Sequence, residues 1–524
     1  MTMFPPTLDA LSMEHLANVA NADKGFSPIV YSITPTNPEF KQTLTYQDLD
    51  DTLGSVDPND TPVVAVIGCG YVGTHLIQAF SRHYDVLGFD ISESRLQLLR
   101  EQFLAEGTKA TLTTQPEDLT RATHMLVSVP TLVSKDKSID TSYMRDALDK
   151  VAKYARRGTT VVIESSVAVG MTRELLGPLA QRRGFFAGMS PERVDPGRVE
   201  PPVEKIPKIL SGLDDVVPGS LDVIQELYSR VFDVLVPVTR PEVAEMMKLY
   251  ENCQRMMNIA FANEMADACI PHGIDPYEVC KAASSKPFGY MPFEPGVGLG
   301  GHCIPVNPWY LLSNSSFPLL KAATEKMEQR PVSIAEKAID SLFNTNHTDQ
   351  SPTKQSSTWE KVGGAGGALM DDKFVRIPSL LHSLTDENVR RLSDTPTVSV
   401  LPPRAPSLGD SDTSDVSGPT IAMQPRILVV GVGFKPGQSN LTNSPGLKVA
   451  QTLHNSGKVE VMFVDPFVEQ SAIPTIPRLD LEQWNKAELE TFDMIIVAFK
   501  QKELDLSVLD TLQNVKVAKW YQER

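Results

Sequence analysis

The sequence predicts an α/β protein in which two doubly wound parallel sheets are joined by a long central helix. Short apolar runs typical of buried parallel strands alternate with helical stretches in two separate parts of the chain. The first part begins with VVAVIG after Pro62, and the second begins with RILVVGVGF, whose first residue follows Pro425. Between them, apolar residues recur at helical spacing from Pro241 onwards. We therefore expect two Rossmann-like domains connected by that helix.

The length of the chain predicts several domains, because 524 residues exceed what one ordinary hydrophobic core encloses. Pro, Asn and Asp recur through the first segment, which indicates a polar extension. Ser, Thr, Pro, Gly and Asp dominate residues 344–424, and so little apolar surface predicts a mostly disordered insertion. The predicted units are the polar extension (1–61), a first Rossmann-like domain (62–240), a central helical domain (241–343), the insertion (344–424) and a second, smaller Rossmann-like domain (425–524).

Charge and hydropathy exclude several classes of protein. The formal net charge is -16 and no basic stripe is present, which argues against a nucleic-acid partner. No apolar run approaches the length of a membrane-spanning helix, and the first residues lack the character of a leader peptide. We therefore expect no nucleic-acid partner and no membrane association.

The cysteines indicate reduced thiols rather than a disulfide framework or a metal site. They are odd in number and scattered, without the spacing of metal ligands. Such thiols favour a cytoplasmic location, and one of them is a candidate for chemistry. The cysteines are Cys69, Cys253, Cys269, Cys280 and Cys303.

A glycine fingerprint follows the first predicted strand. Gly68, Gly70 and Gly73 form G-x-G-x-x-G, which permits a tight turn, close approach of a pyrophosphate and close packing of helix on strand. Asp90 ends the next predicted strand, where a carboxylate binds the ribose hydroxyls of NAD and repels the 2′-phosphate of NADP. The alternative is an ordinary glycine-rich turn and a loop aspartate. We expect NAD at Gly68, Gly70, Tyr71, Val72, Gly73, Asp90 and Arg95.

A second glycine-rich stretch, GVGLGGHCIPVNP, contains Cys303. Its glycines bring the backbone close to another group, and we expect Gly298 and Gly300 to contact a substrate. A cysteine thiolate can anchor the aldehyde stage of an alcohol-to-acid oxidation, first as a thiohemiacetal and then as a thioester. The alternative is a small buried hydrophobic residue, a frequent role of a free cysteine. For His302 we favour a structural hydrogen bond.

Lys248 and Asn252 of the central helix lie four residues apart and therefore on one face. A lysine and an amide side by side can stabilise an oxyanion as charge develops on a reacting oxygen. The spacing alone favours a different interpretation, a solvated helix face on which Lys248 pairs with Glu245 or Glu251.

Taken together, these residues resemble the UDP-glucose/GDP-mannose dehydrogenase family. Several motifs match in order across two domains, and the resemblance covers roughly residues 63–343 and 425–499. The spellings SPERVDPG and GGHCIPV are most similar to the branch that acts on UDP-N-acetylhexosamines. The matching motifs are VVAVIGCGYVG, SVPT, ESSVAVGMTRE, SPERVDPG, AEMMKLYENCQRMMNIAFANE, GVGLGGHCIPVNP and ILVVGVGFKP followed by NSPG.

The resemblance implies an NAD-binding domain, a central helix that forms a homodimer, and a C-terminal domain that binds the UDP moiety. It implies NAD-dependent four-electron oxidation of the C6 alcohol of a nucleotide sugar to the uronic acid, a step of polysaccharide biosynthesis. Cys303 would be the nucleophile, and Lys248 and Asn252 would stabilise the reacting oxygen. Glu192 in SPERV would assist thioester hydrolysis. Ser166 in ESSV would position the water, in place of the family's threonine.

Departures from the family pattern favour an alternative, a diverged non-catalytic or regulatory paralogue that binds NAD or a nucleotide sugar. Asn307 replaces an aspartate four residues after the cysteine, so base assistance worth about 10²–10⁴ in rate would be lost there. Asn440 and Thr442 replace an aspartate and an arginine, although Lys435 in GFKP still resembles a nucleotide-sugar contact. The chain end VKVAKWYQER also lacks the family's closing pattern. A third interpretation, an unrelated NAD-dependent dehydrogenase, leaves the cysteine motif unexplained.

Overall fold

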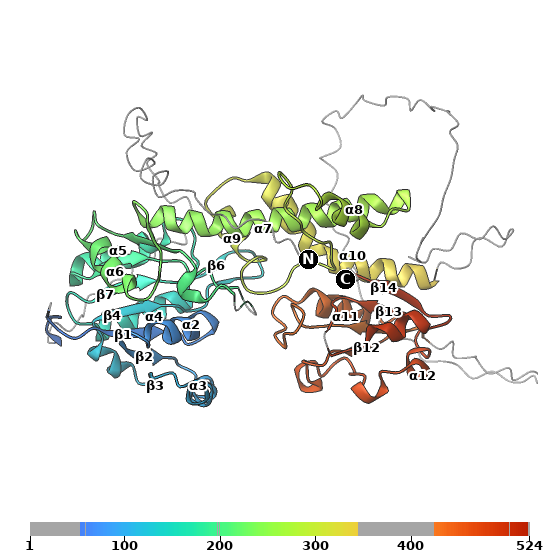
Figure 1. The fold of residues 1–524 in the computed structure, drawn as a ribbon, viewed down its shortest axis with the longest axis horizontal. Coiled ribbons are helices and arrows are strands. Elements are labelled where there is room, and N and C mark those ends of the chain that lie inside the picture. Colours follow the sequence, from blue (N-terminus) through green and yellow to red (C-terminus); the bar gives the residue numbers. More distant parts are fainter. Residues whose placement is uncertain are drawn as a thin grey trace, which may run out of the picture.

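The computed structural model describes residues 53–57, 59–195, 198, 200–343, 424–501 and 503–521. The predicted insertion lies outside these ranges except for its last residue, and the predicted extension lies outside them except for 53–57 and 59–61. In the described part, two α/β units are connected by long helices (Figure 1). Strands and helices alternate in both units as the sequence predicts, so the predicted fold class is confirmed.

The first unit is built on an eight-stranded sheet. Its strands are β1 (Val63–Ile67), β2 (Asp85–Phe89), β3 (Thr111–Thr113), β4 (His124–Val127), β7 (Thr160–Ile163), β8 (Phe186–Met189), β9 (Lys208–Gly212) and β10 (Leu235–Pro237). They stand in the order β10-β9-β8-β7-β4-β1-β2-β3. All neighbours are parallel except β8 and β9, which are antiparallel. The strand order reverses at β1 and β4, where such sheets leave a crevice for a ligand at the carboxyl ends of the strands.

Helices cover both faces of this sheet. They are α2 (Tyr71–Phe80), α3 (Glu93–Glu106), α4 (Ser142–Tyr154), α5 (Met171–Arg183) and α6 (Ser220–Ser229). Ala65 and Ile67 of β1 pack in one cluster with α4 and α5. Val64 and Val66 pack in the other with α2, α3 and α6. Such alternation is expected of a parallel strand that is buried on both faces. A short hairpin of β5 (Leu132–Val133) and β6 (Ile139–Asp140) follows β4.

Long helices connect the two units. The described residues between them form α7 (Pro241–Cys269), α8 (Pro276–Ala283), α9 (Asn307–Leu312) and α10 (Pro318–Phe343). The helix α7 begins at Pro241, with the proline in its first turn as the sequence predicts. It continues into a 3₁₀ turn that stops at Gly273, whose φ of 64° is left-handed. The helix α7 packs against β8 and β9 of the first unit, and α10 packs against α7.

The second unit has a four-stranded parallel sheet. Its strands are β11 (Arg426–Val430), β12 (Glu460–Val464), β13 (Met494–Val497) and β14 (Lys516–Lys519), in the order β12-β11-β13-β14. Its helices are α11 (Pro445–Asn455) and the short α12 (Lys486–Leu489). Ile427 and Val429 pack towards α10 and α11, whereas Leu428 and Val430 pack in a cluster on the other face. Contacts between α10 and α11 join this unit to the central helices.

Candidate active site

The glycine fingerprint forms the turn between β1 and α2. Gly68 has a left-handed φ of 93°, and a Cβ there would lie 2.8 Å from the carbonyl oxygen of Ser128. A Cβ on Gly73 would lie 1.9 Å from the carbonyl oxygen of Gly68, so that position excludes any side chain. A Cβ on Gly70 would meet nothing within 4 Å, and this residue begins α2 without a side-chain cap. The first turn of α2 is therefore open to an anion such as a pyrophosphate.

Asp90 directly follows β2 and lies beside this turn. Its carboxylate accepts hydrogen bonds from the N–H of Cys69 at 2.8 Å and from the N–H of Ser92 at 2.9 Å. Arg95 contacts the same turn, because its Nε donates to the carbonyl oxygen of Cys69 at 2.9 Å and its guanidinium donates to Thr74 Oγ1 at 2.9 Å. These bonds fix the shape of the turn. A direct contact between Arg95 and the cofactor remains a prediction.

Tyr71 and Val72 occupy the first turn of α2. Tyr71 is 40% exposed, and its ring packs edge-on against the ring of His75. Val72 is partly buried against the hydrophobic core. Tyr71 therefore offers a side chain to a ligand at this turn, whereas Val72 contributes packing, and cofactor contacts by both residues remain predictions.

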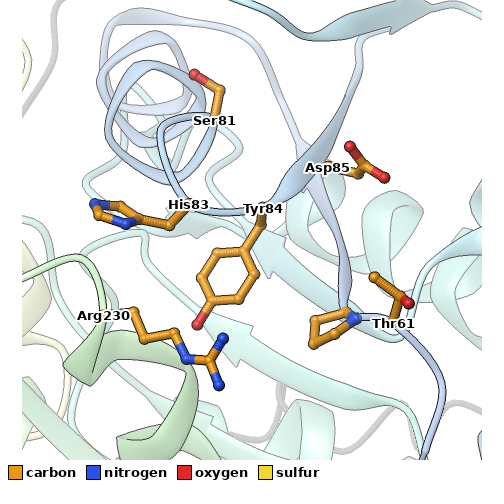
Figure 2. Close-up of a pocket in the computed structure, with 7 residues that line it drawn as sticks. Thr61, Ser81, His83, Tyr84, Asp85 and Arg230 are labelled. Carbon is orange, nitrogen blue, oxygen red and sulfur yellow. The ribbon is translucent and has the colours of Figure 1, made fainter.

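A pocket in the same unit lies next to the starts of β1 and β2 (Figure 2). It is lined by Thr61, Pro62, Ser81, His83, Tyr84, Asp85 and Arg230. The fingerprint and Asp90 lie at the carboxyl ends of the same two strands, which is the opposite edge of the sheet. This pocket is therefore not the candidate cofactor site.

The central helices anchor the first end of the glycine-rich stretch before Cys303. The N–H of Gly296 donates to Asn263 Oδ1 at 2.9 Å, and the carbonyl oxygen of Gly296 accepts from Arg330 Nε at 2.9 Å. Arg330 of α10 also forms an ion pair with Asp267 of α7 at 2.8 Å. Asn263 has no exposed surface and Arg330 is 5% exposed. The stretch therefore starts from a buried anchor.

The second unit holds the other end of this stretch. The N–H of Gly301 donates to the carbonyl oxygen of Thr442, and the carbonyl oxygen of Gly301 accepts from Asn443 Nδ2, both at 2.9 Å. Asn440 Nδ2 lies 3.3 Å from His302 Nε2. Two of the residues that depart from the family pattern thus join the second unit to residues next to the cysteine, Thr442 at the backbone of Gly301 and Asn440 at the side chain of His302.

Gly298 and Gly300 pack closely against neighbouring elements. A Cβ on Gly298 would lie 3.0 Å from Pro331 and 3.1 Å from Pro445, and a Cβ on Gly300 would lie 2.9 Å from Phe434. Close packing alone accounts for the absence of side chains at these two positions. Substrate contacts by Gly298 and Gly300 remain a prediction.

Cys303 is the exposed one of the five cysteines, all of which the structure describes. Its carbonyl oxygen accepts from the N–H of Asn307 at 2.8 Å, which ties it to the start of α9. Partial burial of the thiol raises its pKa, and the nearby Lys248 ammonium opposes this shift. Burial raises the pKa of Cys69 and of Cys253 to about 12, which makes them poor nucleophiles. The interpretation as a buried hydrophobic residue therefore does not fit Cys303.

Lys248 and Asn252 lie on the buried side of α7, and each is 8% exposed. The interpretation of this face as a solvated one is therefore wrong. Burial lowers the pKa of Lys248, while the nearby Cys303, Glu251 and Glu192 act in the opposite direction. A buried ammonium beside a thiol suits the stabilisation of a negative charge.

The two acids considered as surface partners of Lys248 have other partners. Glu245 has no exposed surface, and its carboxylate accepts from backbone N–H groups at the start of α5 at 2.6 and 2.8 Å. Glu251 forms an ion pair with Arg193 and also lies within electrostatic range of Lys248. Packing of α7 onto the first unit, which spacing along one helix does not reveal, accounts for this difference.

Asn307 is 2% exposed, and its Oδ1 accepts from Asn252 Nδ2 at 2.5 Å. The residue that replaces the family's aspartate therefore still orients the amide of Asn252. A neutral amide cannot take a proton, so the loss of base assistance at this position remains a prediction.

Glu192 is buried and surrounded by donors. One carboxylate oxygen accepts from Lys208 Nζ at 2.6 Å, and the other accepts from the N–H groups of Arg193 at 2.6 Å and Val194 at 3.0 Å. Burial alone would raise the pKa of Glu192, but Lys208 and these hydrogen bonds lower it overall. Glu192 is therefore held as a carboxylate. It also lies within electrostatic range of Lys248.

Ser166 and Lys435 have partners of their own. The carbonyl oxygen of Ser166 accepts from Thr131 Oγ1 at 2.9 Å, which joins the segments after β4 and β7. Lys435 Nζ lies 3.5 Å from a carboxylate oxygen of Asp195, and its side chain is 40% exposed. Asp195 lies within electrostatic range of Cys303, but neither Ser166 nor Lys435 has a hydrogen bond to Cys303 among the described contacts, so their assigned roles remain predictions.

A buried charged cluster lies beside Glu192 and was not predicted from the sequence. Lys208 Nζ lies 2.7 Å from Glu164 Oε2, and the Tyr228 hydroxyl donates to the other oxygen of Glu164. Two signals for it exist in the sequence: a lysine that opens the apolar run KILSG, and a glutamate directly after TVVI. Charged residues in or next to buried strands are rare unless they are paired.

Three domains of one family match the described units in order. The NAD binding domain of the UDP-glucose/GDP-mannose dehydrogenase family matches residues 63–232, its central domain matches 242–326, and its UDP binding domain matches 428–520. The UDP-N-acetyl-D-mannosamine dehydrogenase of Pyrococcus horikoshii is 31% identical over 307 residues, 54% of this chain and 72% of that protein. The chain belongs to this family. The predicted family and the predicted NAD cofactor are thereby confirmed.

Other relatives in this family match over shorter stretches. The UDP-N-acetyl-D-glucosamine 6-dehydrogenase of Pseudomonas aeruginosa is 36% identical over 266 residues, 47% of this chain and 62% of that protein. Protein CapL of Staphylococcus aureus is 36% identical over 265 residues, 47% of this chain and 61% of that protein. The chain therefore spans less than two thirds of the length of these two curated relatives.

Solved structures of family members share the fold. The structure of the UDP-D-ManNAc dehydrogenase from Pyrococcus horikoshii superimposes with a TM-score of 0.65 at 23% identity, covering 88% of this chain and 96% of that one. A UDP-glucose dehydrogenase from Pyrobaculum islandicum gives 0.63 at 18% identity, covering 90% and 96%. In the part of this chain that the structure describes, no helix has the length and hydropathy needed to cross a membrane. No cluster of candidate metal ligands occurs in that part either.

Proposed function

We propose that this protein is an NAD-dependent nucleotide-sugar 6-dehydrogenase. Its substrate in this proposal is a UDP-hexose or a UDP-N-acetylhexosamine, whose C6 alcohol becomes the carboxylate of a uronic acid. The observation that carries the proposal is the exposed residue Cys303, whose thiol lies within electrostatic range of the buried Lys248, while Asn307 links its loop to Asn252. Relatives named for UDP-N-acetyl-D-glucosamine and UDP-N-acetyl-D-mannosamine support an N-acetylated substrate.

The turn between β1 and α2 fits NAD. The start of α2 carries no side-chain cap, Gly70 leaves space for a pyrophosphate, and the Asp90 carboxylate suits a ribose diol. Bound there, NAD supplies the hydride acceptor for each of the two oxidations.

Cys303 holds the carbon that is oxidised. When the alcohol has lost a hydride and a proton, the Cys303 thiolate adds to the aldehyde carbon and forms a thiohemiacetal. Loss of a second hydride and of the hydroxyl proton gives a thioester. Water then adds to the thioester carbon, the C–S bond breaks, and the acid leaves with the thiol restored. The Lys248 ammonium and the Asn252 amide stabilise the negative oxygen at each stage.

Further residues have supporting roles in this proposal. Glu192 assists hydrolysis as a buried carboxylate, and Ser166 positions the water. Asn307 orients Asn252, since its side-chain oxygen accepts from that amide. The substrate contacts are assigned to Lys435, Gly298 and Gly300.

The first experiment measures NADH formation by the purified protein with UDP-glucose, UDP-GlcNAc, UDP-ManNAc, UDP-GalNAc and GDP-mannose. We expect about two NADH per sugar consumed, since both oxidations occur on one enzyme. Cys303→Ser should abolish acid formation, whereas Cys280→Ser, at a half-buried cysteine, should retain it. Full activity of Cys303→Ser would contradict the covalent mechanism. Absence of NADH from every sugar, with NAD binding intact, would contradict the proposed activity.

One observation favours a second candidate, a non-catalytic or regulatory paralogue that binds NAD or a nucleotide sugar. Asn440 and Thr442 replace an aspartate and an arginine, and in this structure they contact the Cys303 loop. Asn307→Asp separates the candidates. A large gain in rate would show that asparagine is a defect, whereas an active wild-type protein that gains nothing would count against the paralogue.

The proposed enzyme is a homodimer formed through α7. Large apolar side chains line one face of this helix at helical spacing, and Tyr250 is 69% and Phe261 63% exposed. Exposed apolar surface of this kind marks interaction sites. The residues of this face are Val243, Met246, Tyr250, Phe261 and Met265. Phe261→Glu should convert a dimer to a monomer in light scattering, and an unchanged mass would place the interface elsewhere.

Three further parts complete the proposal: a location, domain boundaries and a metabolic role. A cytoplasmic location follows from five cysteines that form no disulfide in the described structure. The domain boundaries remain 62–240, 241–343 and 425–524, and a role in polysaccharide biosynthesis follows from a uronic acid product.

A further inference from the structure

Lys208 connects two buried carboxylates of the first unit. Its Nζ lies 2.7 Å from Glu164 Oε2 and 2.6 Å from Glu192 Oε2. The side chains of Lys208, Glu164 and Glu192 are 3%, 0% and 4% exposed. Tyr228 donates its hydroxyl to the second oxygen of Glu164. Charges so deeply buried are costly unless every one has a partner, so this arrangement has a specific geometry.

The antiparallel strand β9 explains how the lysine reaches this place. Glu164 follows the carboxyl end of β7, and Glu192 comes shortly after the carboxyl end of β8. Because β9 runs antiparallel to β8, Lys208 at its start lies at that same edge of the sheet. A parallel β9 would put its first residue at the opposite edge.

Electrostatic interactions connect Glu192 of this cluster to the candidate nucleophile through Lys248. Glu192 influences the charge of Lys248, and Lys248 influences the thiol of Cys303. Glu192 has no rotational freedom in this arrangement, because Lys208 holds one oxygen and the backbone of Arg193 and Val194 holds the other. Removal of Lys208 would leave two buried carboxylates facing one another without a cation, and one of them would move or take up a proton.

We propose that Lys208 is a positioning residue for hydrolysis of the Cys303 thioester. It fixes the Glu192 carboxylate, ionised and oriented, within electrostatic range of Lys248. In the step it supports, the oxygen of water bonds to the acyl carbon, the C–S bond breaks, and the protons of water end on the released acid and on the sulfur. This inference rests on the proposed dehydrogenase function.

Lys208→Met tests the inference, because slow hydrolysis should let the Cys303 thioester accumulate. We expect kcat to fall by on the order of tenfold or more while KM for the sugar stays within about threefold, since the substrate sites are unchanged. Intact-protein mass spectrometry after rapid quenching should show the UDP-sugar acyl adduct on Cys303. A purely structural role would lower the thermal midpoint but would leave no adduct.

Two further variants complete the experiment. Glu164→Gln removes an equally buried partner of Lys208 but keeps the pair with Glu192, so it should lower stability without accumulating adduct. Lys208→Arg keeps the charge but changes the position of the donors, so it should fold better than Lys208→Met and still accumulate adduct.

The outcomes separate this inference from the proposed function. Wild-type protein that forms no NADH from any sugar overturns the proposed function and this inference with it. Wild-type protein that turns over, while neither Lys208 variant accumulates adduct, overturns this inference alone. Equal adduct in Glu164→Gln and Lys208→Met also overturns it, because general damage to the cluster would then explain the effect.

Discussion

The two Rossmann-like units share one backbone contact between glycines. In the first unit a Cβ on Gly73 would lie 1.9 Å from the carbonyl oxygen of Gly68. In the second unit a Cβ on Gly446 would lie 2.3 Å from the carbonyl oxygen of Gly431. Each pair lets a helix pack tightly on the first strand of its sheet, which is the packing function of glycine in such turns.

The helices that follow these turns begin differently. Gly70 starts α2 without a side-chain cap, whereas Ser444 caps α11 by accepting from the N–H of Leu447 at 3.2 Å. In the second unit, residues 434–444 lengthen the turn, and part of this segment binds the backbone of Gly301. The same fold therefore has two kinds of helix start. The uncapped start of α2 is open to an anion, whereas the capped start of α11 follows a segment that supports the loop before Cys303.

The aspartates that follow the second strand of each sheet, Asp90 and Asp465, also differ in their access to a ligand. Asp90 lies at the surface of the turn and accepts two backbone N–H groups. Asp465 has no exposed surface, and it accepts from Val432, Gly433, Phe467 and Gln501. The first acid remains accessible to a ribose, while the second is used for structure.

The largest expected effect comes from adding a methyl group at Gly73 or Gly446, the two helix glycines that pack against a backbone carbonyl. Gly73→Ala should abolish NAD binding, because the helix must shift away from the turn that holds the pyrophosphate. Gly446→Ala should leave NAD binding intact and weaken UDP binding. Overpacking of this kind costs about 1–3 kcal/mol or more, so both variants should melt earlier. Calorimetric titration with NAD and with UDP measures both effects.

Gly70→Ala is the matched control for the effect of Gly73→Ala on stability, because its Cβ would meet nothing within 4 Å. It should fold as well as the wild type. If Gly73→Ala bound NAD normally, the two units would not differ in the way proposed.

The next effect concerns the two acids. Asp90→Asn should weaken NAD binding by about 1.5–3 kcal/mol, the contribution of hydrogen bonds to a charged group, and should narrow the preference for NAD over NADP. Asp465→Asn should leave NAD affinity unchanged and lower the free energy of unfolding by about 1–3 kcal/mol, because a buried N–H would lose its acceptor. Equal losses of NAD affinity in both variants would remove the distinction between the units.

A pH effect should appear in the first unit alone. Burial raises the pKa of Glu164 from 4.5 to about 7, with Lys208 acting in the opposite direction. Between these two values the folded chain keeps a proton that the unfolded chain has released, so stability contributed by this group falls as the pH rises. Glu164→Gln should flatten this decline. Hydrogen exchange at several pH values should show the change in β7 and not in β11, and a change in both would contradict it.

The smallest effect concerns the helix caps. Ser444→Ala should destabilise the second unit by about 1 kcal/mol. Gly70→Ser should stabilise the protein without ligand by a few tenths of a kcal/mol, because a hydroxyl would then cap α2. The same hydroxyl should compete with the pyrophosphate and weaken NAD binding. Tighter NAD binding by Gly70→Ser would show that the open helix end is not the anion site.

Much of the fold follows from local patterns. Apolar runs after Pro62 and Pro425 correspond to β1 and β11, and Pro241 begins α7. The direction of β9 does not follow from such patterns, because KILSG would suit a parallel or an antiparallel strand equally well. Strand direction depends on pairing across the sheet, which a local stretch of sequence does not encode.

The site was predictable to a similar extent. The exposure of residue Cys303 and the open turn at Gly70 agree with expectations drawn from motifs. The burial of Lys248 was not accessible from helical spacing, since burial depends on which face packs against β8 and β9. The pair of Lys208 and Glu192 joins residues 16 positions apart through a strand reversal, and no motif marks it.

Because the stretch before Cys303 is anchored at both ends, we expect the reactivity of the thiol to depend on the relative position of the two units. Gly296 is tied to α7 and α10, and Gly301 is tied to the second unit, so residues 297–300 must absorb any displacement of one anchor relative to the other, and Gly301 transmits it to Cys303 two residues later. Alkylation of Cys303 by a small electrophile should therefore change speed when UDP alone occupies the second unit. A screen based on the rate of Cys303 alkylation would detect compounds that change the relative position of the two units without binding at the sulfur.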